Sequence, residues 1–223
     1  MKPKLLDLFC GAGGAAQGYS QAGFDVVGVD IAPQKHYPLE FILADALMFP
    51  LDGYDIIHAS PPCQAYVDSA NKAKHPRLIE LIRDRLIAWG GPYVIENVDC
   101  APLINPLLLC GTMFKLRVIR HRLFESNRPI YFPPASCCHW GKVQNGDFAG
   151  VYGRGARGAR WCDQWGHRGR WGTVPEGGTL LTFWQEAMGI DWMTRAELTQ
   201  AIPPAYTEFI GRYLMQQLTG AKP

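Results

Sequence analysis

The chain has 223 residues, of which 48% are hydrophobic and 19% charged, a composition that fits one globular domain with its own core. It contains no run of 18 or more apolar residues, so the sequence predicts no membrane-spanning helix. A net charge of only +2 indicates no partner by itself. The N-terminus lacks the pattern of a signal peptide, and seven cysteines, an odd number, favour a reduced cytoplasmic setting over a disulfide framework.

The chain begins with an arrangement typical of nucleotide-binding α/β sheets. An apolar strand is predicted over residues 4–10, a glycine turn over 11–14 and a helix over 15–22. Glycines in such a turn let the backbone approach a ligand that lies over the helix N-terminus. Because the glycine spacing matches neither the dinucleotide fingerprint nor a phosphate-binding loop, we expect a nucleoside ligand without phosphates, of which S-adenosylmethionine is the common one.

Two acidic residues follow the next apolar strands. Asp30 ends a strand predicted over 24–30 and lies about 20 positions after the glycine turn, where a carboxylate can accept both hydroxyls of a ribose. Asp45 follows a third apolar stretch, residues 41–43, and could bond an adenine amino group. The alternatives are a solvated strand end for Asp30 and a turn or helix N-cap for Asp45.

A stiff loop with the sequence Ser-Pro-Pro-Cys-Gln occupies residues 60–64, directly after an apolar strand predicted over 54–59. The two prolines end the strand because neither has an N–H for the sheet. They place Cys63 at the strand's C-terminal end, where open α/β sheets bind their ligands. Cys63 is therefore a candidate nucleophile, and a buried, inert thiol is the alternative.

Another strand is expected to end at the same edge of the sheet. A helix is predicted over residues 76–89, followed by a strand over 92–95 and then by Glu96 and Asn97. A carboxyl group at the end of a hydrophobic strand tends to have a raised pKa and can serve as an acid. Glu96 is therefore a candidate general acid.

Residues 117–124 alternate in a strand-like way, which would place Arg120 and Arg122 on the same side. Two guanidinium groups on one strand face usually point to solvent. At a phosphate or carboxylate site they can instead clamp the ligand.

Residues 128–170 are rich in Gly, Arg, Trp and Cys and show no periodicity of a helix or strand. Seven Lys and Arg against two acids give this segment a local charge of +5. Arginines interleaved with flat aromatic side chains suit phosphates and unstacked bases. A glycine-rich surface loop is the alternative. Zinc is a further alternative, with ligands drawn from Cys137, Cys138, His139, Cys162 and His167, but their spacing fits no standard zinc pattern, so we predict no metal.

The C-terminal part returns to regular structure, with helices predicted over residues 182–188, 195–200 and 207–218. The sequence contains neither an internal repeat nor a linker. The organisation that we expect is a core (residues 1–126), a small basic insert (127–180) and a C-terminal helical part that returns to the core (181–223).

Several segments, in this order, resemble the motifs of the cytosine-5 DNA methyltransferases. They are residues 7–14 (Asp-Leu-Phe-Cys-Gly-Ala-Gly-Gly), 61–64 (Pro-Pro-Cys-Gln), 96–98 (Glu-Asn-Val), 120–122 (Arg-x-Arg) and 201–204 (Ala-Ile-Pro-Pro). The resemblance covers roughly residues 4–126 and 180–218, and the compact form is similar to phage-borne members. It implies a Rossmann-like α/β sheet of the S-adenosylmethionine-dependent methyltransferases, with the irregular insert as a target-recognition segment.

Two positions depart from the family's pattern. Val118 stands where the arginine motif usually begins with Gln, and Thr199-Gln200 stands where Gly-Asn usually precedes the last motif. The segment 127–180, in the position of the target-recognition region, is short. The recognition sequence and the need for a partner subunit or oligomer therefore stay open.

The resemblance implies a covalent mechanism. The Cys63 thiolate would add to carbon 6 of cytosine, which makes carbon 5 nucleophilic. Glu96 would neutralise the charge that develops at ring nitrogen 3. Arg122, with Arg120, would hold the carbonyl oxygen of the base and help to keep Cys63 a thiolate, while Asn97 would orient the loop.

The resemblance also implies the binding residues. The cofactor S-adenosylmethionine would be held by Asp7, Phe9, Cys10, Gly11, Ala12, Gly13, Gly14, Asp30, Ile31, Asp45, Ala46, Pro61, Gln200, Ala201 and Ile202. Pro62 and Gln64 of the second motif would hold the substrate. Arg154, Arg157 and Arg160, which the resemblance does not cover, are further substrate-binding candidates because they lie in the basic, aromatic segment.

The expected substrate is double-stranded DNA with a flipped cytosine, in the cytoplasm of a bacterial host if the chain is phage-encoded. Two alternatives stay open: the same chemistry on RNA or a free cytosine nucleotide, and a non-catalytic nucleic-acid-binding module on this fold.

Overall fold

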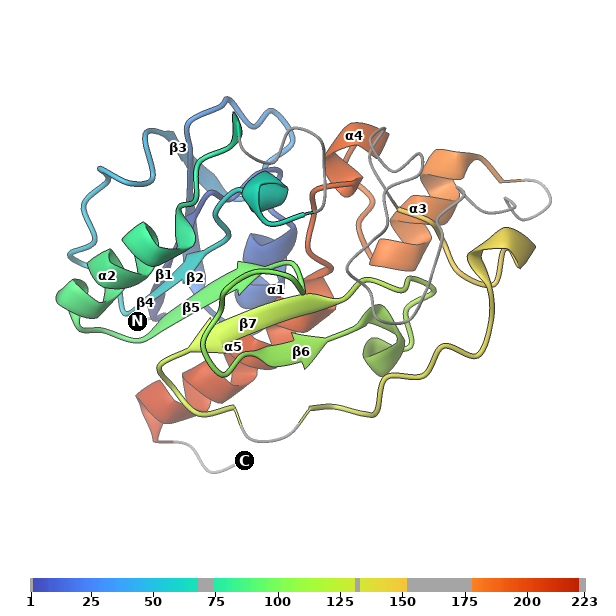
Figure 1. Ribbon diagram of the computed structural model, residues 1–223. Coiled ribbons are helices and arrows are strands. Elements are labelled where there is room, and N and C mark those ends of the chain that lie inside the picture. Colours follow the sequence, from blue (N-terminus) through green and yellow to red (C-terminus); the bar gives the residue numbers. More distant parts are fainter. Residues whose placement is uncertain (1, 68–73, 131–132, 152–177, 221–223) are drawn as a thin grey trace.

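The computed structural model describes residues 2–67, 74–130, 133–151 and 178–220 (Figure 1). Within these residues lies a seven-stranded sheet with the order β3-β2-β1-β4-β5-β7-β6. Strands β1 to β5 are parallel, whereas β7 pairs antiparallel with β5 and β6 pairs antiparallel with β7. The strands are β1 (Lys4–Leu8), β2 (Asp25–Asp30), β3 (Glu40–Leu43), β4 (Ile56–Ala59), β5 (Tyr93–Asn97), β6 (Leu107–Leu109) and β7 (Arg122–Ser126).

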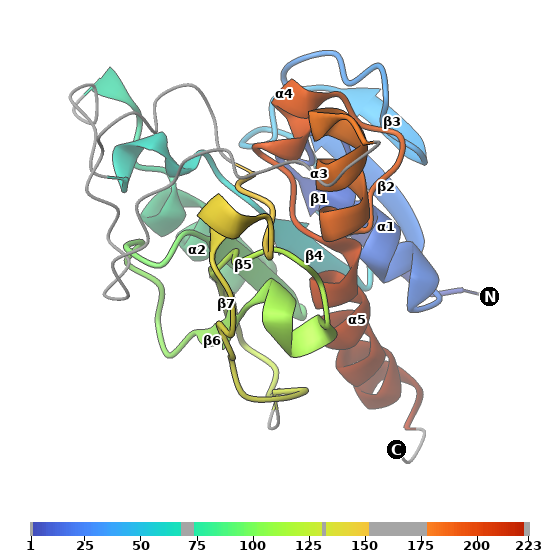
Figure 2. The same ribbon diagram turned by 90° about the vertical axis from the view of Figure 1, so that its right-hand side faces the viewer.

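Helices cover both faces of this sheet. The short helix α1 (Gly14–Gln21) and the long helix α5 (Pro204–Thr219) pack together on one face, and α2 (Ile79–Trp89) lies on the other (Figure 2). The central strands are apolar on both sides for this reason. In β1, Leu5 belongs to the core under α1 and α5, whereas Leu6 belongs to the core under α2.

The order of the strands creates a switch point beside β1. The chain moves outward from β1 through β2 to β3 and then returns to place β4 on the other side of β1. Ligands of open α/β sheets bind at such a point, outside the carboxyl ends of the strands. A ligand site is therefore expected at the carboxyl ends of β1, β2, β4 and β5.

Most of the predicted elements are present with shifts of a few residues at their ends. The strand predicted over 117–124 is wrong, because the observed strand starts five residues later. Strand β7 begins only at Arg122, and Val118 instead forms an isolated bridge with Ala149. The strand predicted over 92–95 runs on to Asn97, so Glu96 is part of β5 and not of a following loop. Strand β6 was not expected from the sequence.

A second core joins the C-terminal part to the described portion of the predicted insert. Helix α3 (Leu180–Met188) packs with Val118, Ala149 and Val151, and a capping box at Thr194 starts the short helix α4 (Arg195–Leu198). Residues 143–151 thus pack against the rest of the molecule. Their one short helix, η4 (Val143–Asn145), was not predicted.

No helix in the described ranges combines the length and apolar character needed to cross a membrane. Among the described cysteines, Cys100 is disulfide-bonded, which departs from the expected reduced setting. Free thiols are found at Cys10, Cys63, Cys110, Cys137 and Cys138.

Candidate active site

A cavity of about 360 Å³ lies at the carboxyl ends of β1, β2, β4 and β5, within the size range of small-molecule sites. The glycine turn, the loop after β4, the end of β5 and the segment after α4 form its walls. Predicted site residues that line it are Asp7, Phe9, Cys10, Gly11, Ala12, Gly14, Asp30, Ile31, Pro61, Pro62, Cys63, Gln64, Glu96, Arg122, Gln200, Ala201 and Ile202. The fold thus gathers residues that are nearly 200 positions apart.

The glycine turn is fixed by the carboxylate at the end of β2. The Gly11 N–H donates to Asp30 Oδ2 at 3.0 Å, and the Ala32 N–H donates to Asp30 Oδ1 at 2.9 Å. Gly11 has a φ of 51°, and a Cβ there would meet nothing within 4 Å. The carboxylate oxygens of Asp30 keep further lone pairs, so Asp30 can hold the turn and still accept hydrogen bonds from a ligand.

The next two glycines serve packing. A Cβ on Gly14 would lie 2.3 Å from the Ile202 carbonyl oxygen, so a side chain there would push away the C-terminal segment that closes the cavity. Gly13 has a φ of 84°, and its Cβ would lie 2.6 Å from Pro38 Cδ. Gly13 does not line the cavity, in contrast to its predicted place among the cofactor residues.

A buried carboxylate without a hydrogen-bond partner also lines the cavity. Asp7, on β1, is fully buried, and neither of its carboxylate oxygens has a hydrogen-bond partner. Burial, together with the charges of Asp30 and Glu96, raises its pKa well above the ordinary value. Buried polar groups are almost always bonded. An orphaned carboxylate that lines a cavity therefore suggests a missing cationic or hydrogen-bond-donating ligand.

Cys63 begins a single turn of 3₁₀ helix, η1 (Cys63–Ala65), directly after the two prolines. Asn97 at the end of β5 holds this loop, because its Nδ2 donates to the Pro61 carbonyl oxygen at 2.8 Å. This is the contact that an orienting role for Asn97 requires. Burial raises the pKa of Cys63 and Glu96 raises it further, while Arg122 and Arg120 lower it. The arginines therefore act in the expected direction but offset burial only in part.

Glu96 and Arg122 form an ion pair on the cavity wall, with Arg122 Nε 3.1 Å from Glu96 Oε1. The geometry is not that of a hydrogen bond, so Oε1 keeps no hydrogen-bond partner. Burial raises the pKa of Glu96, in spite of the opposing effects of Arg122, Ser60 and Arg120. Glu96 thus has the environment of a general acid.

A buried hydrogen-bonded chain behind Glu96 was missed by the sequence reasoning. The Tyr19 hydroxyl bonds to His58 Nδ1 at 3.0 Å, and His58 Nε2 bonds to Ser60 Oγ at 2.8 Å. Ser60 also lowers the pKa of the Glu96 carboxyl, against the larger effect of burial. Burial lowers the pKa of His58 to about 3, so this histidine is neutral. One of its ring nitrogens therefore donates a hydrogen bond and the other accepts one.

The structure separates Arg120 from Arg122. The buried Arg120 donates through Nη1 to the Val151 carbonyl oxygen at 3.1 Å and through Nη2 to the Thr199 carbonyl oxygen at 2.8 Å. It does not line the cavity, because it precedes β7 instead of sharing a strand face with Arg122. These contacts attach Arg120 to the segments around Val151 and Thr199, and a catalytic role for Arg120 stays a prediction.

Asp45 and Ala46 also lie outside the cavity. The Leu47 N–H donates to Asp45 Oδ1 at 2.9 Å, so the side chain caps a turn, which was the alternative to adenine binding. Ala46 is buried in the core under α2. Arg154, Arg157 and Arg160 fall outside the described residues.

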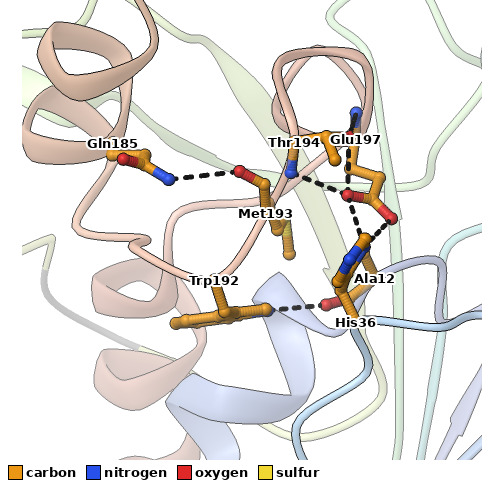
Figure 3. A network of polar contacts seen from close by, with 7 residues as sticks. All are labelled: Ala12, His36, Gln185, Trp192, Met193, Thr194 and Glu197. Atoms are coloured by element: carbon orange, nitrogen blue, oxygen red, sulfur yellow. Dashed lines mark hydrogen bonds and ion pairs between the residues drawn. The ribbon is translucent and has the colours of Figure 1, made fainter.

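A polar network closes the rim of the cavity (Figure 3). Trp192 Nε1 donates to the Ala12 carbonyl oxygen at 3.0 Å, and His36 Nδ1 lies 2.8 Å from Glu197 Oε1. Glu197 also completes the capping box of α4 with Thr194. The Trp192 side chain thus attaches the C-terminal segment to the backbone of the glycine turn, and Glu197 attaches it to His36 in the loop after β2. Lining residues that the sequence reasoning missed are Ala15, Gln34, Ser60, Val98, Glu197 and Thr199.

Comparisons with known proteins address the fold. Neither a protein-family model nor a curated protein matches the sequence. A protein from an E. coli prophage, described as a putative DNA modification methyltransferase, has a TM-score of 0.65 at 14% identity, covering 98% of this chain and 100% of that chain. The S. pombe Dnmt2 methyltransferase gives 0.63 at 12% identity, covering 99% and 100%. The Entamoeba histolytica methyltransferase EhMeth gives 0.61 at 13% identity, covering 98% and 99%. The predicted Rossmann-like methyltransferase fold is confirmed.

Proposed function

We propose that the protein is a DNA cytosine-5 methyltransferase that uses S-adenosylmethionine and a covalent Cys63 adduct. The observation that carries this proposal is the meeting of Cys63, Glu96 and Arg122 in one cavity with the glycine turn. A candidate nucleophile, a candidate acid and a fixed cation thus share one wall, and a candidate nucleoside site forms the other. A non-catalytic binding module would have no use for this arrangement.

The cavity suits the proposed cofactor. Asp30 lies at the strand end where a ribose is commonly bound. The orphaned carboxylate of Asp7 is a suitable partner for a cation, and S-adenosylmethionine carries an ammonium and a sulfonium group. When bound, the cofactor would supply an electrophilic methyl group. Gly11 leaves the open space that a close approach to the backbone requires.

The chain's own residues would activate cytosine carbon 5. The sulfur of Cys63 adds to carbon 6, and the ring becomes electron-rich at carbon 5. Glu96 gives a proton to ring nitrogen 3 and so removes the negative charge that the addition creates. Arg122 faces the carbonyl oxygen of the base. After methylation a base removes the proton from carbon 5, and the Cys63 sulfur leaves by elimination.

The protonation states of Cys63 and Glu96 are coupled in a way that favours this order. The charge of Glu96 is one of the causes that raise the pKa of Cys63. A proton on Glu96 therefore makes the Cys63 thiolate easier to form, because the two anions no longer repel each other. Burial raises the pKa of both groups, so it favours the neutral acid at Glu96 and opposes the Cys63 thiolate, which the charge of Arg122 favours.

DNA is the proposed substrate because the motif resemblance and the similar prophage protein both point to DNA modification. The target carbon lies inside the stack of a duplex, so the base must flip into the cavity at a cost of a few kcal/mol. The basic, tryptophan-rich residues 128–170 supply charges and stacking surfaces for compensating contacts.

Trapping with 5-fluorocytosine tests the mechanism. Duplex DNA that contains this base should become covalently attached in the presence of S-adenosylmethionine, since fluorine blocks the final elimination. Cys63→Ala should abolish both the adduct and methyl transfer while cofactor binding persists. Cys138→Ala, an exposed cysteine outside the cavity, serves as the matched control and should retain both. Full activity of Cys63→Ala would disprove the assignment of the nucleophile.

A competition assay tests the substrate. Duplex DNA, RNA of the same sequence and deoxycytidine monophosphate are offered together with labelled cofactor. Preferential labelling of DNA is expected. Labelling of RNA or of the nucleotide, with a trapped Cys63 adduct, would keep the chemistry and replace the substrate.

A further inference from the structure

The antiparallel pair β6–β7 brings a cysteine and a histidine together outside the active-site cavity. Leu109 pairs with Arg122, so the next residues outward along the ladder, Cys110 and His121, face each other across it. Neither lines the cavity, although His121 directly precedes the cavity residue Arg122. Neither Cys110 nor His121 was assigned a role from the sequence, although Arg120 and Arg122 beside His121 were.

A separate segment adds a second cysteine and histidine to this pair. Cys137 and His139 approach Cys110 and His121, and the four ligand atoms all lie within 4.8 Å of one another. The sulfur of Cys137 lies 3.4 Å from His121 Nε2 and 2.9 Å from His139 Nε2. The sulfur of Cys110 lies 3.5 Å from His139 Nε2. One ion at the centre could thus reach all four donors.

The separations fit a tetrahedral metal site. Zinc–sulfur bonds of about 2.3 Å and zinc–nitrogen bonds of about 2.0–2.1 Å place a sulfur and a nitrogen ligand about 3.6 Å apart. Two of the three sulfur–nitrogen distances are 3.4 and 3.5 Å, and the third is shorter. His139 Nε2 faces two sulfurs at once, which suits ligands around a common centre better than paired hydrogen bonds.

The surroundings of the cluster supply a second layer of contacts. The Thr112 hydroxyl donates to the Cys110 sulfur at 3.4 Å and lies 3.8 Å from the Cys137 sulfur. The same hydroxyl accepts the Cys138 N–H at 3.3 Å. Hydrogen bonds of this kind orient thiolate ligands and stabilise their charge. Cys110 and Cys137 are free thiols, so a disulfide does not occupy the position.

We propose that Cys110, His121, Cys137 and His139 bind a structural zinc ion. Two cysteines and two histidines are a common ligand set of structural zinc, and four protein ligands leave no open position for catalysis. Of the zinc ligands considered from the sequence, Cys137 and His139 belong to this set and Cys138 does not. Cys162 and His167 lie outside the described residues.

The ion would attach an irregular segment to the sheet. Residues 133–142 contain no helix or strand. Val143 and Phe148, which follow them, form a small core with Cys110 and Ile119. Such a small core contributes little stability, and a metal can replace the missing packing. This segment leads into the basic residues proposed to contact DNA. The zinc site would therefore anchor the start of those residues to the sheet.

Metal content of the full-length chain tests the proposal. Protein purified from zinc-supplemented medium and exchanged into metal-free buffer should hold an equimolar amount of zinc by elemental analysis. Cobalt(II) in its place should give intense tetrahedral ligand-field bands and a sulfur-to-cobalt charge-transfer band. Substoichiometric zinc together with an octahedral cobalt spectrum would overturn the proposal.

Two variants separate the ligand set from its neighbour. Cys137→Ser removes a ligand from an exposed position, so it opens no cavity in the core, and it should lose the bound zinc and the charge-transfer intensity of one thiolate. Cys138→Ser changes the adjacent residue, which is also exposed, and should keep both. Circular dichroism confirms that each variant is folded. Equal loss of zinc in both variants would exclude this ligand set.

Discussion

Two buried arginine–glutamate pairs lie on opposite faces of the β5–β7 ladder, and they differ in how completely their polar atoms are bonded. Arg83 Nε and Nη2 donate to the two carboxylate oxygens of Glu125, each at 2.7 Å, and the Ile104 N–H donates to one of these oxygens. Arg122 Nε instead approaches a single oxygen of Glu96, and that oxygen has no hydrogen-bond partner.

The alternation of strand residues explains why one ladder carries both pairs. Ile95 pairs with Glu125, and Glu96 pairs with Phe124, so the two glutamates point to opposite faces. Glu125 forms its ion pair with Arg83 on α2, whereas Glu96 lines the cavity. A saturated pair attaches a helix to the sheet. A pair with an unused acceptor at a cavity is open to a ligand.

Other orphaned atoms agree with this distinction. Besides Glu96, the cavity-lining Asp7 and Gln64 carry buried side-chain oxygens without a hydrogen-bond partner; the Tyr37 hydroxyl is such an atom outside the cavity lining. Since native proteins bond nearly all of their buried polar atoms, a group of such atoms around one cavity indicates that the site is completed by what it binds.

The largest effect expected from this comparison is on stability at the saturated pair. Glu125→Gln keeps the shape of the side chain but leaves Arg83 as a buried charge without its counter-ion, where the side chains are only 10% and 5% exposed. We expect the free energy of unfolding to fall by about 3 kcal/mol. Urea unfolding measures this loss, and methyl transfer per folded molecule should remain unchanged.

The double variant Arg83→Met/Glu125→Gln separates the pair from general damage. Removing both partners leaves no unpaired charge, so much of the lost stability should return. A single variant that loses less than about 1 kcal/mol, or whose methyl transfer per folded molecule also falls, would erase the distinction between the two pairs.

Glu96→Gln should show the opposite pattern. The amide cannot give a proton to the base, so we expect methyl transfer to slow by roughly 100-fold, which corresponds to about 2.7 kcal/mol in the transition state. Cofactor binding should persist. Single-turnover transfer to duplex DNA measures the rate, with Glu125→Gln as the matched control. An unchanged rate would remove Glu96 from the mechanism.

The structure brings Cys63, Glu96 and Arg122 into one cavity, as expected from strand ends and prolines, which are local signals; their catalytic roles stay a prediction. Cys63 follows a buried strand and two prolines, and both features can be read within a few residues. Arg120 shows the limit of the same reasoning. Its alternation with Arg122 suggested a shared strand face, but strand β7 starts after it, and the partner carbonyl groups come from Val151 and Thr199.

Contacts over long sequence separations could not be predicted in the same way. The Cys110 and His121 pair arises from the register of β6 with β7, and β6 was not expected at all. Their partners arrive with an irregular segment that carries no periodic signal. His58 could have been flagged as a histidine inside an apolar strand. Its partner Ser60 is only two residues further along the chain, but its partner Tyr19 depends on the packing of α1.

The smallest expected effect concerns the carboxylate that has no partner at all. The pKa of Asp7 is raised well above its ordinary value, chiefly because burial disfavours the charged form. Its folded state therefore binds a proton that the unfolded state has lost, and stability falls as the pH rises above the unfolded pKa of about 3.9. Asp7→Asn should remove this loss. We expect a gain of about 1 kcal/mol at pH 8 and almost none at pH 4, by urea unfolding.

The same substitution should weaken binding of the proposed cofactor, because a neutral amide cannot pair with its cation. A hydrogen bond to a charged group contributes about 1.5–3 kcal/mol, so the dissociation constant for S-adenosylmethionine should rise at least about tenfold in calorimetry. Asp45→Asn changes a carboxylate outside the cavity and should leave binding unchanged. A stabilised Asp7→Asn that binds the cofactor normally would show that Asp7 is unpaired without being a ligand. The absence of hydrogen bonds would then no longer distinguish the residues of the site from those that only hold the fold.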